Sequence, residues 1–315
     1  MMTSHGTGIL TTAGTALALF LITNLAGCNA PQEQDQPSAG TTTELADNID
    51  IAALAGDEVQ RALFLGDMAR QGLAVTTLAY CSSPPPYTTD TGKGSISVTV
   101  DDVDPPGRSA GDSYATTYNN CVQFGRTLNG SSKFTIVTLT GDPTQPPPAI
   151  WSITTTAVSD LTVTLATSSY TERSNYNFSH GTLDGVSYAR VAEGTSSGSV
   201  TRAGVTTPQS GNFKNTLDID YSLNTYTYTM SVDKKTVAGD VLIETLTPLT
   251  GTVGDSPASG AIRVTRSTAT TRSITTTTAL GGGNARVDVD NNGDGVIDST
   301  VTLPWSTAGF GCCFN

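Results

Sequence analysis

The side chains best suited to chemistry lie near the C-terminal end of the chain, in residues 290–298 (DNNGDGVID). Oxygen-bearing side chains stand at Asp290, Asn292, Asp294 and Asp298, and the main-chain carbonyl of Val296 adds a fifth oxygen. Calcium prefers several hard oxygen ligands, and a glycine at the sixth position of the run permits the sharp turn that brings them together. The spacing therefore predicts a candidate calcium site.

Two features separate this run from a helix–loop–helix calcium motif. The twelfth position, where a bidentate Glu is expected, holds Val301, and the flanking residues alternate as in strands, with Val287 and Val289 before the run and Leu303 after it. The run resembles the Asp-rich calcium turns that join strands in exported bacterial proteins. A plain hairpin turn explains the same residues, since Asn, Asp and Gly tolerate turn conformations.

No catalytic constellation stands out elsewhere. Residues 194–198 (GTSSG) satisfy G-x-S-x-G, but this nucleophile motif needs a helix after the turn and a later histidine. The sequence continues as a strand, and the one histidine after the leader, His180, comes earlier, so we interpret the match as chance. We read His180 as an exposed loop histidine, and one histidine cannot form a multi-histidine metal site.

Acidic residues also gather at 101–104 and at Asp112, where Pro105 and Pro106 interrupt any regular ligand spacing. We interpret this segment as a solvated loop. Paired carboxylates that act as acid and base stay open, because the distance between two side chains is not contained in the sequence.

The first residues have the form of an export signal. An apolar run at 16–22 is too short to span a bilayer, and it leads to Leu25-Ala26-Gly27-Cys28. These four residues resemble the signals of bacterial lipoproteins. The resemblance implies that Cys28 becomes the mature N-terminus, carries lipid and attaches the protein to a membrane of the cell envelope. Asn29 after the cysteine implies outer-membrane delivery in a Gram-negative cell. A chance cysteine after an ordinary signal peptide is the alternative.

The other cysteines are Cys81, Cys121, Cys312 and Cys313. An exported protein permits disulfides, and four cysteines allow three pairings. We favour Cys81 with Cys121, since adjacent cysteines bond to each other only with strain. The sequence alone leaves the pairing open.

The rest of the chain divides by composition. Residues 1–27 form the predicted signal peptide and residues 28–50 a flexible tether. Residues 51–83 form a helical segment, residues 94–305 a β-domain, and residues 306–315 a C-terminal tail. A short echo between 125–130 (GRTLNG) and 181–185 (GTLDG) suggests two β-units that divide near residue 170.

The β-domain is assigned from its period of two. Apolar residues occupy odd positions at Leu217 and Ile219 and even positions at Tyr226 and Tyr228, so the phase changes at Asn224, as a tight hairpin or a bulge requires. Asn-Gly, Gly-Asp-Pro and Asp-Gly pairs and a Gly-Gly-Gly run supply turn signals at 129–130, 141–143, 184–185 and 281–283. The pattern predicts a mainly β fold: an antiparallel meander, built as a curved sheet, half-barrel or sandwich, preceded by one N-terminal helix.

Charge and composition narrow the function. The formal net charge of −12 disfavours nucleic acid as a partner. Residues 118–121 and the run from 290 to 305 loosely resemble uncharacterised exported β-rich bacterial proteins, which imply no activity. Three functions follow in order: a non-enzymatic structural or interaction module, a carrier that binds an apolar ligand on a curved sheet near Leu217, Ile219 and Tyr221, and a carbohydrate-active hydrolase. We assign Trp151 and Trp305 to the core.

Overall fold

The computed structural model describes Cys81 and residues 92–105, 107–123, 126–142, 149–164, 168–182, 184–202, 204–237 and 239–305. The predicted signal peptide, tether and C-terminal tail lie outside these residues, as does the helix expected within 51–83. Among the described residues there is no helix long and apolar enough to cross a membrane.

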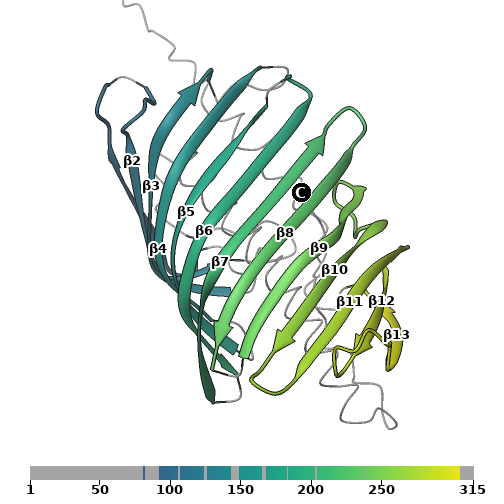
Figure 1. The fold of residues 1–315 in the computed structure, drawn as a ribbon. Helices are drawn as coiled ribbons and strands as arrows, with labels where there is room; N and C mark the ends of the chain where they lie inside the picture. The colour runs from purple at the N-terminus through teal and green to yellow at the C-terminus, as the bar shows by residue number, and fades with distance from the viewer. Residues whose placement is uncertain are drawn as a thin grey trace, which may run out of the picture.

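The described residues form one antiparallel sheet of thirteen strands in which each strand pairs with its neighbours in sequence (Figure 1). The strands are β1 (Ser95–Asp101), β2 (Ser113–Gln123), β3 (Arg126–Thr140), β4 (Trp151–Thr164), β5 (Ser168–Thr182), β6 (Ser187–Arg202), β7 (Val205–Asp220), β8 (Thr225–Thr236), β9 (Gly239–Thr252), β10 (Ser259–Ser267), β11 (Arg272–Gly281), β12 (Asn284–Asp290) and β13 (Ser299–Pro304).

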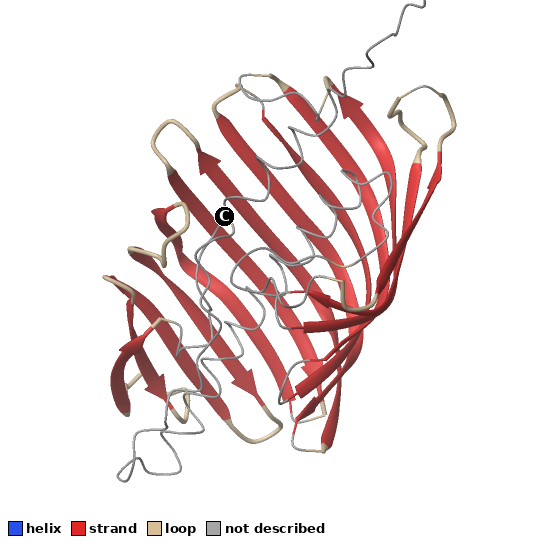
Figure 2. Ribbon diagram, turned by 180° about the vertical axis from the view of Figure 1, so that it is seen from behind, coloured by secondary structure: helices blue, strands red, loops and turns tan. Residues whose placement is uncertain are grey.

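The predicted mainly β meander is therefore confirmed. The sheet does not close, because β1 and β13 are its two edges, and it twists and curves around the face seen in Figure 2. Residue 170 lies within β5, which pairs with β4 from Ser169 to Thr182. The sheet thus continues without interruption through the point at which the sequence suggests a division.

Alternating side chains give the sheet an inner and an outer face. In β4 the odd positions from Ile153 to Val163 are buried, whereas Val158 and Asp160 are exposed. Successive side chains of a strand point to opposite faces, so this pattern assigns the odd positions of β4 to the inner face. The even positions form the outer face, which is exposed.

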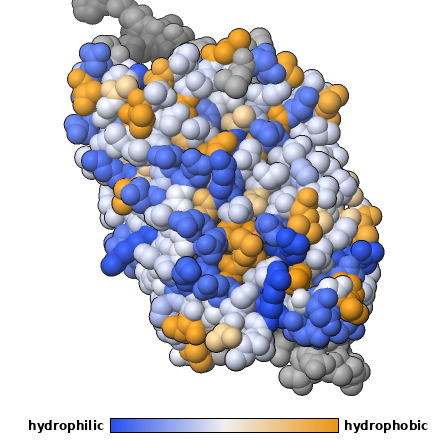
Figure 3. Space-filling model, viewed as in Figure 1, coloured by the Kyte–Doolittle hydropathy of each residue, from blue (hydrophilic) through white to orange (hydrophobic). Residues whose placement is uncertain are grey.

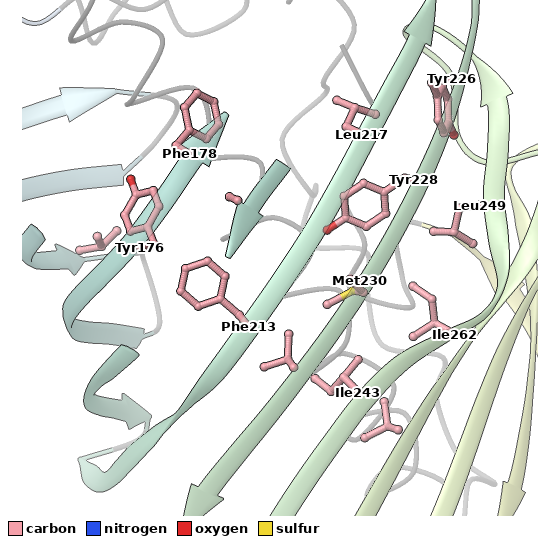
Figure 4. Packing of buried hydrophobic residues seen from close by; sticks show 14 of the residues in the cluster. Tyr176, Phe178, Phe213, Leu217, Tyr226, Tyr228, Met230, Ile243, Leu249 and Ile262 are labelled. Carbon is pink, nitrogen blue, oxygen red and sulfur yellow. The ribbon is translucent and has the colours of Figure 1, made fainter. Parts of the chain in front are cut away.

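The inner face carries the large apolar side chains (Figure 4). Phe178, Leu217 and Tyr228 are fully buried in one cluster that runs from β1 to β13. Burying a side chain of this size stabilises a fold by roughly 1.5–3 kcal/mol. Trp305 belongs to the same cluster, which confirms its assignment to the core, and Trp151 packs against it.

Two asparagines with positive φ mark changes of direction in the chain. Asn224 (φ 54°) ends the β7–β8 turn, which confirms the hairpin expected where the apolar phase changes. Asn120 (φ 46°) lies in a β-bulge of β2 between Tyr118 and Cys121, and its backbone N–H donates to the side chain of Asn129 (2.8 Å). Asparagine adopts this conformation more readily than most residues.

The turn predicted at Asn129-Gly130 is wrong, because both residues lie inside β3. Gly130 has a φ of 114°, and a Cβ there would lie 2.1 Å from the carbonyl oxygen of Asp160 in β4. The glycine therefore permits a close approach of two strands within the sheet, and the Asn side chain braces the facing bulge in β2.

A disulfide joins Cys81 to Cys121 of β2, the pairing favoured from the sequence, with Cα atoms 5.5 Å apart. Both cysteines are fully buried and belong to the inner-face cluster. The main chain is tied nearby, since Gly92 N–H donates to the Cys81 carbonyl (2.8 Å). The bridge thus fixes a residue that precedes the sheet against its inner face.

We expect the double variant Cys81→Ala/Cys121→Ala to be less stable. The sequence separation of 40 residues corresponds to a loss of about 4 kcal/mol in the free energy of unfolding, because the bridge restricts the unfolded chain. In a thermal melt this should lower Tm by roughly 10 °C. A reductant should lower the Tm of the wild type but not of the variant, and an unchanged wild-type Tm would contradict the bridge.

Candidate functional site

The loop of residues 290–298 joins β12 to the edge strand β13. The Asp290 carboxylate is buried at its base and accepts four backbone N–H groups: those of Gly293 (2.6 Å) and Gly295 (2.9 Å), and more distantly those of Asn292 and Asp294 (both 3.3 Å). Burial alone would raise the pKa of Asp290, but these four donors outweigh it and hold the pKa below its usual value.

The remaining side chains of the loop are also bonded within it. The Asp298 carboxylate accepts the N–H of Asn291 (2.7 Å), and Asp294 bonds to the side chain of Asn292 (3.0 Å) and to the N–H of Val296 (2.8 Å). Among the described residues, no three His, Cys, Asp or Glu side chains converge on a point where a metal ion would fit. Calcium binding here requires Asp294 and Asp298 to turn towards Asp290, and it stays a prediction.

The second acidic segment is only partly solvated. Asp101, Asp102 and Asp104 are exposed, as expected, but Asp112 is fully buried. Its carboxylate accepts the N–H of Val103 (2.9 Å) and both the N–H (2.7 Å) and the hydroxyl (3.0 Å) of Ser109. Asp112 therefore holds the long β1–β2 connection in shape, a structural role that the sequence interpretation missed.

The interpretation of His180 as an exposed loop residue is wrong. His180 lies on the inner face of β5 and is 6% exposed. Its ring packs edge-on against Trp151 (5.2 Å between centroids) and beside Phe178 (4.8 Å), and its Nδ1 lies 3.3 Å from the hydroxyl of Tyr188. The even numbering that it shares with buried Tyr176 and Phe178 is the sequence signal that would have assigned it to this face.

The G-x-S-x-G match lies in the middle of β6, which runs without a break through Ser187–Arg202. A nucleophile motif needs a sharp strand-to-helix turn, and β6 pairs in register with β5 and β7 along this segment. The geometry agrees with the interpretation of the motif as chance. Its residues instead supply small side chains to both faces of the sheet.

The residues proposed to line an apolar binding face do not lie together. Leu217 (0% exposed) and Ile219 (3%) belong to the inner-face cluster, and Leu217 packs beside Tyr228 of the next strand. Tyr221 lies in the β7–β8 turn and is 48% exposed. Two of the three side chains are thus committed to the core.

The outer face offers a different surface. Figure 3 shows it as mostly hydrophilic or of neutral hydropathy, with scattered hydrophobic patches. A shallow depression of about 650 Å³ crosses β4 to β8 on this face. We call it the outer groove; its lining residues are Val158, Ser159, Asp160, Arg173, Ser174, Asn175, Thr195, Ser196, Ser197, Ser210, Gly211, Asn212, Asp233 and Lys235.

The register explains why the outer groove is hollow. Arg173 of β5, Ser197 of β6, Ser210 of β7 and Lys235 of β8 stand opposite one another in one row. Two short serines in the middle of this row lie between two long side chains, so the surface dips at β6 and β7. The sequence of one strand shows only that its side chains alternate between the two faces. The row of four outward side chains appears when β5 to β8 are placed in register.

Charges in the outer groove are balanced. Asp160 and Arg173 form an ion pair (3.1 Å), and Lys235 bonds to Asp240 of β9 (3.4 Å). These pairs are exposed, and exposed pairs contribute little to stability. With Asp233, the lining contributes two carboxylates and two cations, so the groove itself is close to neutral in a chain that is strongly acidic.

We expect Asp290→Asn to lower Tm by several degrees at neutral pH, because an amide accepts the loop N–H groups less well than a carboxylate. Since the folded-state pKa of Asp290 is lowered, its contribution is present above the unfolded pKa of about 3.9 and is lost as pH falls through the folded value. The difference in Tm between wild type and variant should therefore shrink below about pH 4. Asp233→Asn, an exposed change on β8, is the control, and a pH-independent difference would contradict this role.

The lipidation residue predicted from the sequence, Cys28, lies outside the described residues, as do Cys312 and Cys313. Comparison with known proteins adds no relative, because no family model, curated protein or solved structure matches the chain. A functional assignment therefore depends on the residues of this chain: the lipoprotein-like leader, a sheet with one buried and one exposed face, and the outer groove.

Proposed function

We propose that the chain is a lipid-anchored protein of the bacterial cell envelope that serves as a non-enzymatic interaction module and binds through the outer face of its sheet. The observation that carries this proposal is the separation of the two faces. Large apolar side chains gather on the inner face, whereas the outer face is a broad polar surface with a groove across β4 to β8. Such a surface can contact a partner without rearrangement of the core.

The anchor comes from the leader. Leu25-Ala26-Gly27-Cys28 follows a short apolar run, and the polar, proline-bearing segment 28–50 after it suits a tether. Lipid on Cys28 would attach the chain to a membrane, and Asn29 favours the outer membrane in a Gram-negative cell. The described sheet then extends from the anchor into the envelope space.

The alternative of an apolar-ligand carrier receives less support. A carrier needs a concave apolar surface with room for the ligand. Leu217, Tyr228 and Ile243 of the inner-face cluster are at most 1% exposed. A ligand would have to displace existing contacts of these residues.

The hydrolase alternative is also less well supported. Two carboxylates that cleave a glycosidic bond stand about 5–10 Å apart. The two carboxylates of the outer groove, Asp160 and Asp233, lie on β4 and β8, four strand spacings apart, which is roughly 19 Å along the sheet. Asp160 is in addition paired with Arg173. An interaction module therefore fits this groove better than a catalytic one.

Calcium at residues 290–298 would suit the same function. The loop closes the hairpin at one edge of the open sheet, and among the described strands β13 pairs only with β12. An ion bridging Asp290, Asp294 and Asp298 would hold this edge hairpin together, with Asn292 and the Val296 carbonyl as further oxygen donors.

We expect millimolar calcium to raise the Tm of the wild type relative to chelator, because a ligand that binds only the folded state stabilises it. Asp294→Asn should abolish this rise in Tm. The variant keeps Asp290, whose carboxylate the loop needs for its own backbone hydrogen bonds. Magnesium is the control ion, since it tolerates an irregular oxygen site less well. Equal melting curves with calcium and chelator would remove calcium from the proposal.

The anchor is tested by labelling bacteria that express the chain with an alkyne fatty acid. The wild type should be labelled and recovered with membranes, whereas Cys28→Ala should be unlabelled and released from them. Cys81→Ala/Cys121→Ala is the matched control, because it removes two cysteines but leaves the lipidation residue. An unlabelled wild type would refute the proposal.

A further inference from the structure

The outer groove contains two parallel rows of polar side chains. The first row holds Asp160, Arg173, Ser197, Ser210 and Lys235, and the second holds Asn175, Thr195, Asn212 and Asp233 beside Val158. Neighbouring members of a row are about 4.8 Å apart, and the two rows are about 7 Å apart along the strands. The groove therefore runs across the strands over a length of roughly 19 Å, which suits an extended chain.

The centre of the groove holds exposed hydrogen-bonding side chains that bond to no other side chain of the described sheet. The side chains of Asn175, Thr195, Ser197, Ser210 and Asn212 are exposed, and none is hydrogen-bonded to another described residue. At the two ends of the groove the cations are ion-paired, Arg173 with Asp160 and Lys235 with Asp240. Hydroxyls and carboxamides offer both donors and acceptors, so the centre can match a ligand that does the same.

The lining also argues against other ligand classes. It contains no aromatic side chain, so it provides no platform on which nucleic-acid bases would stack. Val158 is its one sizeable apolar side chain, which leaves little to bind an apolar ligand. Its charges balance in a chain of net charge −12, so a polyanion gains no attraction here. A neutral ligand rich in hydroxyl groups meets each of these conditions.

We infer that the outer groove binds an uncharged polysaccharide chain, laid across β4 to β8 with its hydroxyl groups on the side chains of β5 to β7. This inference rests on the proposed interaction module and names its ligand class. Ser197 and Ser210 form the floor, Asn175 and Asn212 exchange hydrogen bonds with sugar hydroxyls, and Arg173 and Lys235 form the walls. Bridging water accommodates imperfect contacts, as is common in polar interfaces.

The test is electrophoresis of the complete exported chain, carrying Cys28→Ala so that lipid does not contribute, through native gels that contain dextran, soluble starch or galactomannan. We expect at least one of these neutral polysaccharides to retard the protein. Ser210→Tyr, which fills the floor with a side chain that strands tolerate well, should weaken the interaction by about tenfold. Asn212→Ala should also weaken it, by removal of two hydrogen-bonding groups without added bulk.

Thr302→Tyr is the matched control, because Thr302 is exposed on β13 and far from the outer groove in strand order. It should leave the retardation unchanged, and the melting curves of all three variants should match that of the parent. Equal mobility in every neutral gel would overturn the inference, as would retardation that survives both groove changes. Stronger retardation by carboxymethyl dextran than by dextran, or binding only to a polar Gly-Ser-Asn peptide, would also overturn it. Fatty-acid labelling of Cys28 is independent of these outcomes, so failure here would leave the anchor standing.

Discussion

The antiparallel pairing of each strand with its sequence neighbours is the constraint on which this structure depends. Each strand of the meander pairs with the next, and backbone hydrogen bonds hold the pair in one register. Because side chains alternate between faces, a slip of one residue would exchange the core and the solvent face of a strand. Register therefore decides at once what is buried, what is exposed and which outward side chains become neighbours.

The inner face shows how far this constraint extends. In β5 it places His180, Tyr176 and Phe178 on the buried side, so that a histidine next to a Ser and a Gly packs among aromatic rings. The Cys81–Cys121 bridge joins the same surface. The bulge at Asn120 corrects the phase of β2 so that both Tyr118 and Cys121 point inward, although an odd number of positions separates them.

The side chains of the outer face are exposed and do not pack in the core, so their types can suit contact with a partner. Short polar residues on β6 and β7 lie between longer charged ones on β5 and β8, which produces a groove without any interruption of the sheet. The glycines that face the other way, such as Gly211, allow neighbouring strands to approach closely; a Cβ there would lie 1.9 Å from the carbonyl oxygen of Asp233. Gly194 and Gly198 of the run that resembles a nucleophile motif have the same role, since a Cβ there would lie 2.2 Å from the carbonyl oxygen of Asn175 and 1.9 Å from that of Thr171.

The sequence by itself predicted the antiparallel β-meander and a change of direction near Asn224, and it favoured Cys81 with Cys121 among three possible pairings, because these depend on local periodicity, backbone preference and residue inventory. It also carries the lipoprotein-like leader. Tertiary structure alone decided that Asn129-Gly130 lies within a strand, that Asp112 is buried, and that Ser197 and Ser210 stand side by side. The physical reason is that cross-strand neighbours are set by the accumulated register of many hairpins and bulges. No single strand contains that information.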